Sequence, residues 1–300
     1  MSKIGIVTVL YNSETVLTEF FETLNVQTFT DFTLYVVDNK SPDNSLELTK
    51  SLSSKMDFRT VVIENEDNYG VAKGNNIGIK EALKDGCEYI LLSNNDVVLE
   101  PQTIESLLSG LENSETDMAV PKIFYHGTDF IWAAGGKFTY YNGSTKHFGG
   151  RKKDDGRYDK QRKVSYSPTC FMIIKREVFE KVGFMDENYF VYYDDTDFIW
   201  RCRENGVELF YLPQSVVYHK ESTSTGGQKS DFVIYYMERN RIYFTLKNIG
   251  GLQSVMVKLY NVVHNNLRKP FVLDKKQLEL ARKAQKEGRE LHKKFVNGRS

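Results

Sequence analysis

Strand and helix signals alternate through the first hundred residues, and this alternation constrains the fold more than any other feature of the sequence. Short β-branched, apolar runs indicate strands, and segments with apolar residues at helical spacing indicate amphipathic helices. The expected strands are residues 3–10, 33–37, 60–64 and 89–93, and the expected helices are residues 15–24, 45–52 and 74–83. The pattern predicts an α/β fold with a mostly parallel central sheet flanked by helices.

Polar residues follow each of these predicted strands. Tyr11 and Asn12 follow the first strand, Asp38 the second, Asn68 the third and Asp96 the fourth. Ligands of parallel α/β sheets bind beyond the carboxyl ends of the strands. The sequence therefore predicts a ligand site at this edge of the sheet.

The end of the fourth predicted strand carries a candidate metal ligand. The run Asn94-Asn95-Asp96 places a carboxylate beside amides, which suits Mg²⁺ or Mn²⁺ held jointly with a diphosphate. His219 follows another apolar strand and precedes a Gly-rich loop, as a metal or phosphate ligand can. Both features also have a structural explanation, because Asn and Asp form Asx turns and a lone histidine is more often structural.

Three acids lie close together at the start of a helix expected over residues 195–204. Asp194, Asp195 and Asp197 repel one another unless a cation or a protonation role stabilises them, and one could be a general base. Acids at a helix N-terminus also offset the helix macrodipole, so the cluster alone leaves both interpretations open.

A segment rich in Gly and Asn, residues 68–78, is expected to form a turn that enters the helix beginning at residue 74. Such turns present backbone N–H groups to anions. The spacing matches neither a Walker A loop nor a G-x-G-x-x-G fingerprint, so it is weak evidence for anion binding.

Composition and cysteine spacing exclude several classes of protein. The 300 residues hold 40 basic and 40 acidic side chains, so the chain as a whole is not built to hold nucleic acid. Cys87, Cys170 and Cys202 lie far apart, which argues against a disulfide framework or a zinc knuckle and fits a reducing cytoplasm. Because no secretion signal and no run of about 20 apolar residues is visible, we expect a cytoplasmic protein, soluble or peripheral at the inner face of the membrane. The oligomeric state stays open.

Charge is distributed unevenly along the chain. Residues 258–300 hold twelve Lys and Arg against four Asp and Glu, a net charge of +8, and apolar residues are interspersed among them. From residue 231 the chain is expected to be mostly helical. Such a basic tail could contact an anionic membrane peripherally, or it could form a helical hairpin that packs on the rest of the protein or on a partner subunit.

The polar motifs become specific through their order. They run Thr8 to Asn12, Val37 to Asp43, Asn68 to Gly78 and Leu91 to Asp96, followed by Gly183 to Glu187, Tyr192 to Arg201 and His219. This ordered set resembles family-two glycosyltransferases of the GT-A fold, over roughly residues 3–250. Trp132 to Gly136 and Arg239 to Arg241 resemble the bacterial rhamnosyltransferase-like branch of that family.

The resemblance implies a GT-A (Rossmann-like) catalytic domain over residues 1–250, with a nucleotide-binding half (1–120) and an acceptor and catalytic half (121–250). A basic helical extension would follow over residues 251–300.

The resemblance also implies roles for the matching residues. Asp195 would be the general base, with Asp194 beside it. Asp96 would hold the metal that bridges the diphosphate, and His219 would complete the metal shell. The nucleotide-sugar site would comprise Thr8, Tyr11, Asn12, Asp38, Asn68, Lys73, Asn76, Asn95 and Asp96, with Asp38 at the nucleoside base or ribose. Asn94 departs from the family pattern, in which many relatives carry Asp, and this weakens the expectation of strict metal dependence.

An inverting glycosyltransferase that uses Mn²⁺ or Mg²⁺ is the activity this resemblance implies. The donor would be dTDP-rhamnose or a UDP-sugar, and the acceptor a hydroxyl of a glycan or a lipid-linked molecule in bacterial surface polysaccharide synthesis. Two alternatives are a nucleotidyltransferase and a non-catalytic protein that binds sugar or nucleotide. No Gly-rich Arg/Lys signature follows Thr8, which argues against the first, and the retained Asp96, Asp195 and His219 argue against the second.

Overall fold

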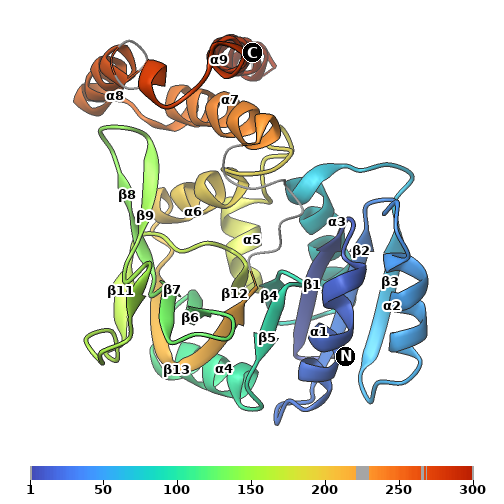
Figure 1. Ribbon diagram of the computed structural model, residues 1–300. Coiled ribbons are helices and arrows are strands. Elements are labelled where there is room, and N and C mark those ends of the chain that lie inside the picture. Colours follow the sequence, from blue (N-terminus) through green and yellow to red (C-terminus); the bar gives the residue numbers. More distant parts are fainter. Residues whose placement is uncertain (1, 221–229, 265–266, 268, 299–300) are drawn as a thin grey trace.

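The computed structural model describes residues 2–220, 230–264, 267 and 269–298 (Figure 1). Its first part alternates strands and helices as the sequence predicts. The elements are β1 (Ile4–Leu10), α1 (Glu14–Asn25), β2 (Phe32–Asp38), α2 (Ser45–Ser53), β3 (Arg59–Glu64), α3 (Gly70–Lys84) and β4 (Tyr89–Ser93). β1 lies between β2 and β4, β3 pairs with β2, and all three pairings are parallel. The prediction of a parallel α/β arrangement is confirmed for this part of the chain.

Beyond β4 the sheet becomes mixed. The further elements are β5 (Val97–Leu99), α4 (Thr103–Asn113), β6 (Met118–Tyr125), β7 (Phe130–Ala133), β10 (Lys152–Lys153), β11 (Arg162–Val164), β12 (Phe171–Lys175) and β13 (Leu209–His219). The sheet follows the order β10-β7-β6-β12-β4-β1-β2-β3. β12 is antiparallel to both β4 and β6, whereas β13 runs parallel to β6 and antiparallel to β5. A separate hairpin consists of β8 (Gly136–Thr139) and β9 (Ser144–His147).

Apolar side chains pack on both faces of the sheet. α1, α2 and α4 cover one face, where Phe20, Phe21 and Leu107 are fully buried. α3, α5 (Arg176–Val182) and α6 (Asp194–Glu204) cover the other face. Because burying one such side chain stabilises the fold by about 1.5–3 kcal/mol, these layers hold the strand ends firmly in place.

The C-terminal helices form a layer at one end of the molecule (Figure 1). They are α7 (Asp231–Asn248), α8 (Gly251–Val263), the 3-10 turn η3 (Lys269–Phe271) and α9 (Lys275–Asn297). α9 packs closely along α7, since a Cβ added at Gly288 would lie 2.3 Å from the carbonyl oxygen of Arg239. The predicted helical extension is confirmed, and α9 follows the alternative in which the tail packs on the protein. Within the described residues, no helix combines the length and apolarity needed to cross a bilayer.

Candidate active site

The carboxyl ends of β1 and β4 border a cavity of about 670 Å³. Tyr11, Asn12, Asn68, Asn95 and Asp96 line this cavity, so the structure brings together five of the predicted nucleotide-sugar residues. The amide of Asn95 donates a hydrogen bond of 2.8 Å to the carbonyl of Val9, which ties the end of β4 to β1. A cavity of this volume is typical of a small-molecule site.

The cavity has a second wall that the sequence analysis missed. Phe232 and Tyr236, from the first two turns of α7, line it together with Phe190. The ring centroids of Tyr236 lie 5.3 Å from Phe190 and 4.8 Å from Phe232. No local signal in the sequence of α7 indicates that it folds over strands from the other end of the chain. Asn39 also lines the cavity and directly follows β2. As a polar residue at a strand end, it could have been predicted as a lining residue from the sequence.

Thr8, Asp38 and Lys73 do not line the cavity. Thr8 is fully buried in β1. Asp38 is also buried, and its carboxylate accepts the backbone N–H of Ser41 at 3.2 Å. The ammonium of Lys73 lies 3.6 Å from the ring centroid of Tyr69. These three residues surround the site without facing its interior, and their donor-binding roles stay predictions.

Asn76 is placed between two elements. Its side-chain amide donates to the carbonyl of Met185 at 2.9 Å and accepts the backbone N–H of the same residue at 3.0 Å. A third contact, to the carboxylate of Glu187, is 3.0 Å long. In this structure Asn76 clamps α3 to the loop that follows α5.

The Gly/Asn-rich segment is not the turn that the sequence predicts. It forms the first turns of α3, which begins at Gly70, so the expectation of a loop of free N–H groups before residue 74 is wrong. Gly70 adopts a φ of +78° and abuts the backbone of Phe190. A Cβ at Gly78 would lie 2.5 Å from Cγ1 of Val7. The glycines therefore permit close helix–strand packing. The helix begins at Gly70, four residues before the predicted start, and its N-terminus lies at the cavity.

Asp96 and His219 meet at the edge of the cavity although they are far apart in sequence. Asp96 follows β4 and His219 ends β13, and the Oδ1 and Nε2 atoms lie 3.1 Å apart. Both residues are buried, and Nδ1 of His219 has no hydrogen-bond partner among the described residues. A carboxylate and an imidazole side by side suit a divalent cation. The described part of the chain holds no group of three or more His, Cys, Asp and Glu arranged to bind a metal ion, so two protein ligands fit such an ion only if a diphosphate completes the shell.

A row of aromatic rings connects this pair to the acidic helix start. The ring of Trp132 lies 4.6 Å from that of His219 and 4.9 Å from that of His147. His147 stacks on Tyr166 at 6.0 Å, and the Tyr166 hydroxyl donates a 2.6 Å hydrogen bond to Oδ2 of Asp195. The structure thus places Asp96, His219 and Asp195 in one neighbourhood.

Asp194 and Asp195 begin α6 in different surroundings. The preceding residues, Tyr192 and Tyr193, have φ values of +62° and +67°, a rare conformation for non-glycine residues that tertiary contacts must hold. Burial raises the pKa of both carboxyls, and the charge of Asp195 raises that of Asp194 further. Hydrogen bonds from Tyr166 and Thr196 oppose the shift at Asp195. Asp195 is therefore the better hydrogen-bonded carboxylate of the two.

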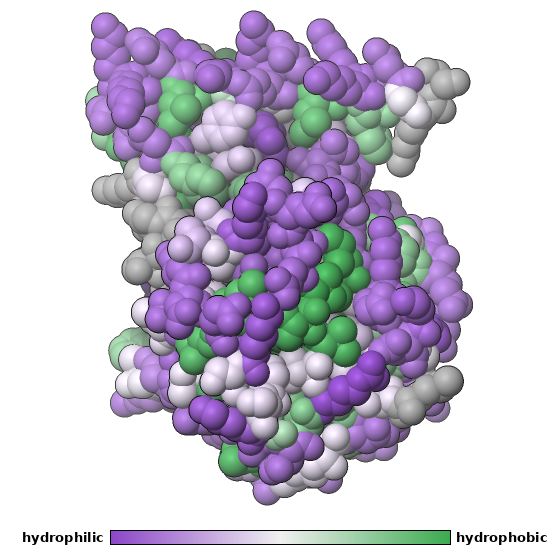
Figure 2. Space-filling model, turned by 90° about the vertical axis from the view of Figure 1, so that its right-hand side faces the viewer, coloured by the Kyte–Doolittle hydropathy of each residue, from purple (hydrophilic) through white to green (hydrophobic). Residues whose placement is uncertain are grey.

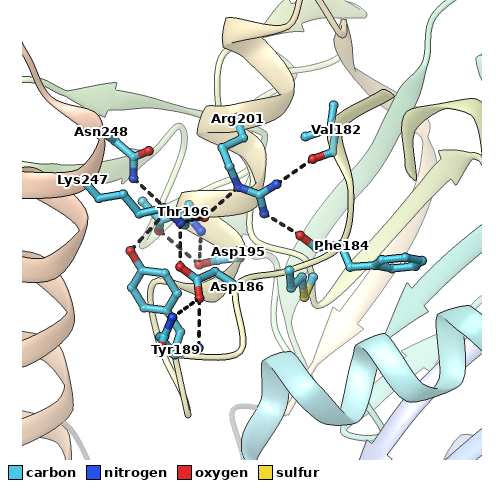
Figure 3. Close-up of polar contacts among 12 residues, drawn as sticks. Val182, Phe184, Asp186, Tyr189, Asp195, Thr196, Arg201, Lys247 and Asn248 are labelled. Carbon is cyan, nitrogen blue, oxygen red and sulfur yellow. Dashed lines mark hydrogen bonds and ion pairs between the residues drawn. The ribbon is translucent and has the colours of Figure 1, made fainter. Parts of the chain in front are cut away.

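Asp197, the third acid, has a structural role, and Figure 3 labels three of the side chains that contact it, Arg201, Lys247 and Asn248. It is fully buried and accepts Arg201 Nε at 2.9 Å, Lys247 Nζ at 2.9 Å and Asn248 Nδ2 at 2.7 Å. Lys247 also pairs with Asp186 at 2.6 Å. For Asp197, the stabilising cations that the sequence analysis called for are protein side chains, Arg201 of α6 and Lys247 of α7.

The structure is that of an α/β enzyme with a small-molecule cavity at the carboxyl edge of its parallel strands. Asp96 lines this cavity and pairs with His219, whereas Asp195 lies outside the lining and is linked to the pair through the aromatic row. The family model described as glycosyl transferase family 2 matches residues 5–183, and the chain belongs to this family. It is a glycosyltransferase with the GT-A fold.

Relatives and solved structures agree with this assignment. The chain is 28% identical over 212 residues to the dTDP-rhamnosyl transferase RfbF of Shigella flexneri, covering 67% of this chain and 68% of the relative. The structure of Staphylococcus aureus TarS 1-349 in complex with UDP aligns with a TM-score of 0.58 at 15% identity, over 99% of this chain and 92% of TarS 1-349. GalNAc-T7 with UDP, GalNAc and Mn²⁺ aligns with a TM-score of 0.68 at 14% identity, over 97% of this chain and 56% of that one.

Proposed function

We propose that this glycosyltransferase moves one sugar, with inversion, from a nucleotide-diphosphate sugar in the 670 Å³ cavity to an acceptor hydroxyl. The observation that carries the proposal is the pairing of Asp96 with His219 at the cavity edge, together with the aromatic row that leads from there to Asp195. This arrangement offers a ligand set for the leaving group and a base for the nucleophile within one site.

Asp195 is the proposed general base. The acceptor oxygen attacks the anomeric carbon, the bond from that carbon to the diphosphate breaks, and the hydroxyl proton passes to the carboxylate of Asp195. A single displacement inverts the anomeric centre and needs no carboxyl nucleophile. The Tyr166 hydrogen bond orients the carboxylate and opposes the rise in its pKa that burial causes.

Asp96 and His219 would hold Mn²⁺ or Mg²⁺. When bound, the ion supplies Lewis-acid stabilisation of the negative charge on the departing diphosphate. The Mn²⁺ complex of GalNAc-T7, a structural neighbour, supports a divalent ion in this fold. Tyr11, Asn12, Asn68 and Asn95 bind and orient the donor from the cavity walls.

The donor and acceptor follow from the relatives. RfbF is a dTDP-rhamnosyl transferase and TarS binds UDP, so we propose dTDP-rhamnose or a UDP-sugar as the donor. The acceptor would be a glycan or a lipid-linked glycan in bacterial surface polysaccharide synthesis. Thr8, Asp38, Lys73 and Asn76 would then shape the nucleotide pocket from behind its lining, and residues 121–250 would form the acceptor half.

The test is the release of nucleoside diphosphate from a panel of nucleotide sugars with Mn²⁺. Wild-type protein should release it from at least one donor, and Asp195→Asn, which keeps the shape but removes the base, should lower turnover by about 10²–10⁴-fold. The matched variant Asp194→Asn should lose much less. Release of pyrophosphate would identify a nucleotidyltransferase instead, and a crippled Asp194→Asn beside a mildly affected Asp195→Asn would show that the base is misassigned.

A further inference from the structure

α8 is apolar on the side that faces solvent. Leu252, Val255, Met256, Leu259, Val262 and Val263 are all exposed, with exposed fractions of 39–78%. They follow a spacing of three and four residues, which puts them on one face of the helix. The opposite face carries Val257, the one buried side chain of α8. A surface helix of a soluble protein normally turns its apolar face towards the core, whereas α8 turns its apolar face towards solvent.

Three apolar residues after α8 are exposed as well. Leu267, Phe271 and Val272 are exposed at 64%, 89% and 60%. The upper part of Figure 2, where the C-terminal helices lie, is mainly hydrophilic in that view, so exposed apolar residues are not general in this layer. Exposed apolar residues gathered in one segment indicate an interaction site.

The segment that carries the exposed apolar residues has no acidic side chain. Residues 249–273 contain no Asp or Glu. A cavity of about 650 Å³ lies between α7, α8 and α9, and the exposed cations Lys258, Arg282 and Arg289 line it beside Val262. In the described part of the chain these three cations form no ion pair; the neighbouring pairs involve other lysines.

We propose that α8 docks on the surface of an anionic lipid bilayer. Its apolar face would insert at the level of the headgroups, and Lys258, Arg282 and Arg289 would meet the anionic headgroups. With 13 residues the helix is about 20 Å long, too short to cross a hydrocarbon core of about 30 Å, so it lies in the interface plane.

A second copy of the chain fits this surface less well than lipid does. Two copies that meet face to face bring like charges together, and residues 249–273 offer no acid to pair with them. The helix also holds fewer than two heptads, whereas a coiled-coil seam needs about three or four.

Docking through α8 would fix the position of the donor cavity relative to the bilayer. α7 connects the two, because its first turns line the cavity and its end leads into α8. At 18 residues α7 is about 27 Å long, so about that length of helix separates the cavity wall from the start of α8. This inference goes beyond the proposed catalytic function and does not depend on it.

The test is co-sedimentation of the full chain, without donor, with vesicles of phosphatidylcholine alone or mixed with phosphatidylglycerol. We expect binding to the mixed vesicles only, weakened by salt. Val263→Glu should lower the partition coefficient about tenfold or more, because it puts a charge at the insertion face. Val26→Glu is the matched control, since Val26 is 58% exposed and Val263 55%, and both changes add one negative charge. Val263→Asn should also weaken binding, which separates loss of apolar contact from added charge.

Three outcomes would overturn the proposal. The first is no sedimentation with either vesicle, and the second is equal sedimentation with both. The third is an equal loss in Val263→Glu and Val26→Glu. Sedimentation equilibrium without lipid identifies the other occupant: a wild-type dimer that Val263→Glu converts to a monomer, with no vesicle binding, would mean that α8 pairs with a second copy. Because both valines are exposed, thermal unfolding should show that all variants remain folded.

Discussion

Asp194 and Asp195 are adjacent in sequence, and their surroundings differ. Asp195 receives hydrogen bonds from Tyr166 and Thr196, which favour the ionised form that a general base needs. Burial and the neighbouring charge raise the pKa of Asp194, which favours its neutral form. The different environments of the two carboxyl groups fit the proposed roles, with Asp195 as the general base and Asp194 as a neighbour that takes no part in proton transfer.

This difference predicts how stability depends on pH. The pKa of Asp194 is raised in the folded protein, so between the unfolded and the folded pKa the folded state holds a proton that the unfolded state has lost. Stability therefore falls as pH rises through that window. Asp194→Asn removes this penalty, and its melting temperature should exceed that of wild type by more at about pH 8 than at about pH 5. A gap that is constant or shrinks with pH would contradict the assigned direction.

At the scale of elements, α6 is held against α7 by a buried ionic network. Asp197 and Asp186 share Lys247, and Arg201 also donates to the carbonyls of Val182 and Phe184 at 3.0 and 2.7 Å (Figure 3). The network thereby fixes the first turn of α6, which carries Asp195, to the end of α7. Lys247 acts as a positioning residue in this arrangement.

Lys247→Met should destabilise the protein strongly. It keeps the aliphatic stem but leaves two buried carboxylates with less compensation, and breaking a buried pair costs about 3–5 kcal/mol. Urea unfolding measures the change. Lys276→Met is the matched control: its partner is Asp231, both side chains are largely exposed, and such a pair contributes about 0–1 kcal/mol. Equal losses in the two variants would show that the network is not a stabilising core.

The elements also show where sequence reasoning reached its limit. Hydrophobic periodicity predicted β1 to β4 and the helices between them, because those signals are local. It placed the start of α3 too late. The glycines there allow close packing against Val7 and Phe190, which sequence periodicity does not reveal. Periodicity does not indicate that α7 lines the cavity or that Lys247 pairs with Asp197, because both are tertiary contacts between distant segments.

At the scale of the whole molecule, two parts with different surfaces are joined. The sheet carries the cavity at its carboxyl edge, and the helical layer covers that edge with α7 while α8 exposes its apolar face. Strand order brings Asp96 and His219 together across the sheet, since β5 and β13 pair with Val97 opposite His219. The contact between Asp96 and His219 was predicted only through the family resemblance, because no spacing in the sequence indicates it.

In the proposed function, Asp96 and His219 bind a nucleoside diphosphate through a divalent ion. Titration calorimetry of UDP and dTDP with Mn²⁺ and with EDTA, using uridine and thymidine as references, tests it most directly. We predict diphosphate binding that needs Mn²⁺ and is weakened about tenfold or more by Asp96→Ala, with little effect on the nucleosides. Diphosphate binding of equal strength in EDTA, or unchanged by Asp96→Ala, would contradict the account.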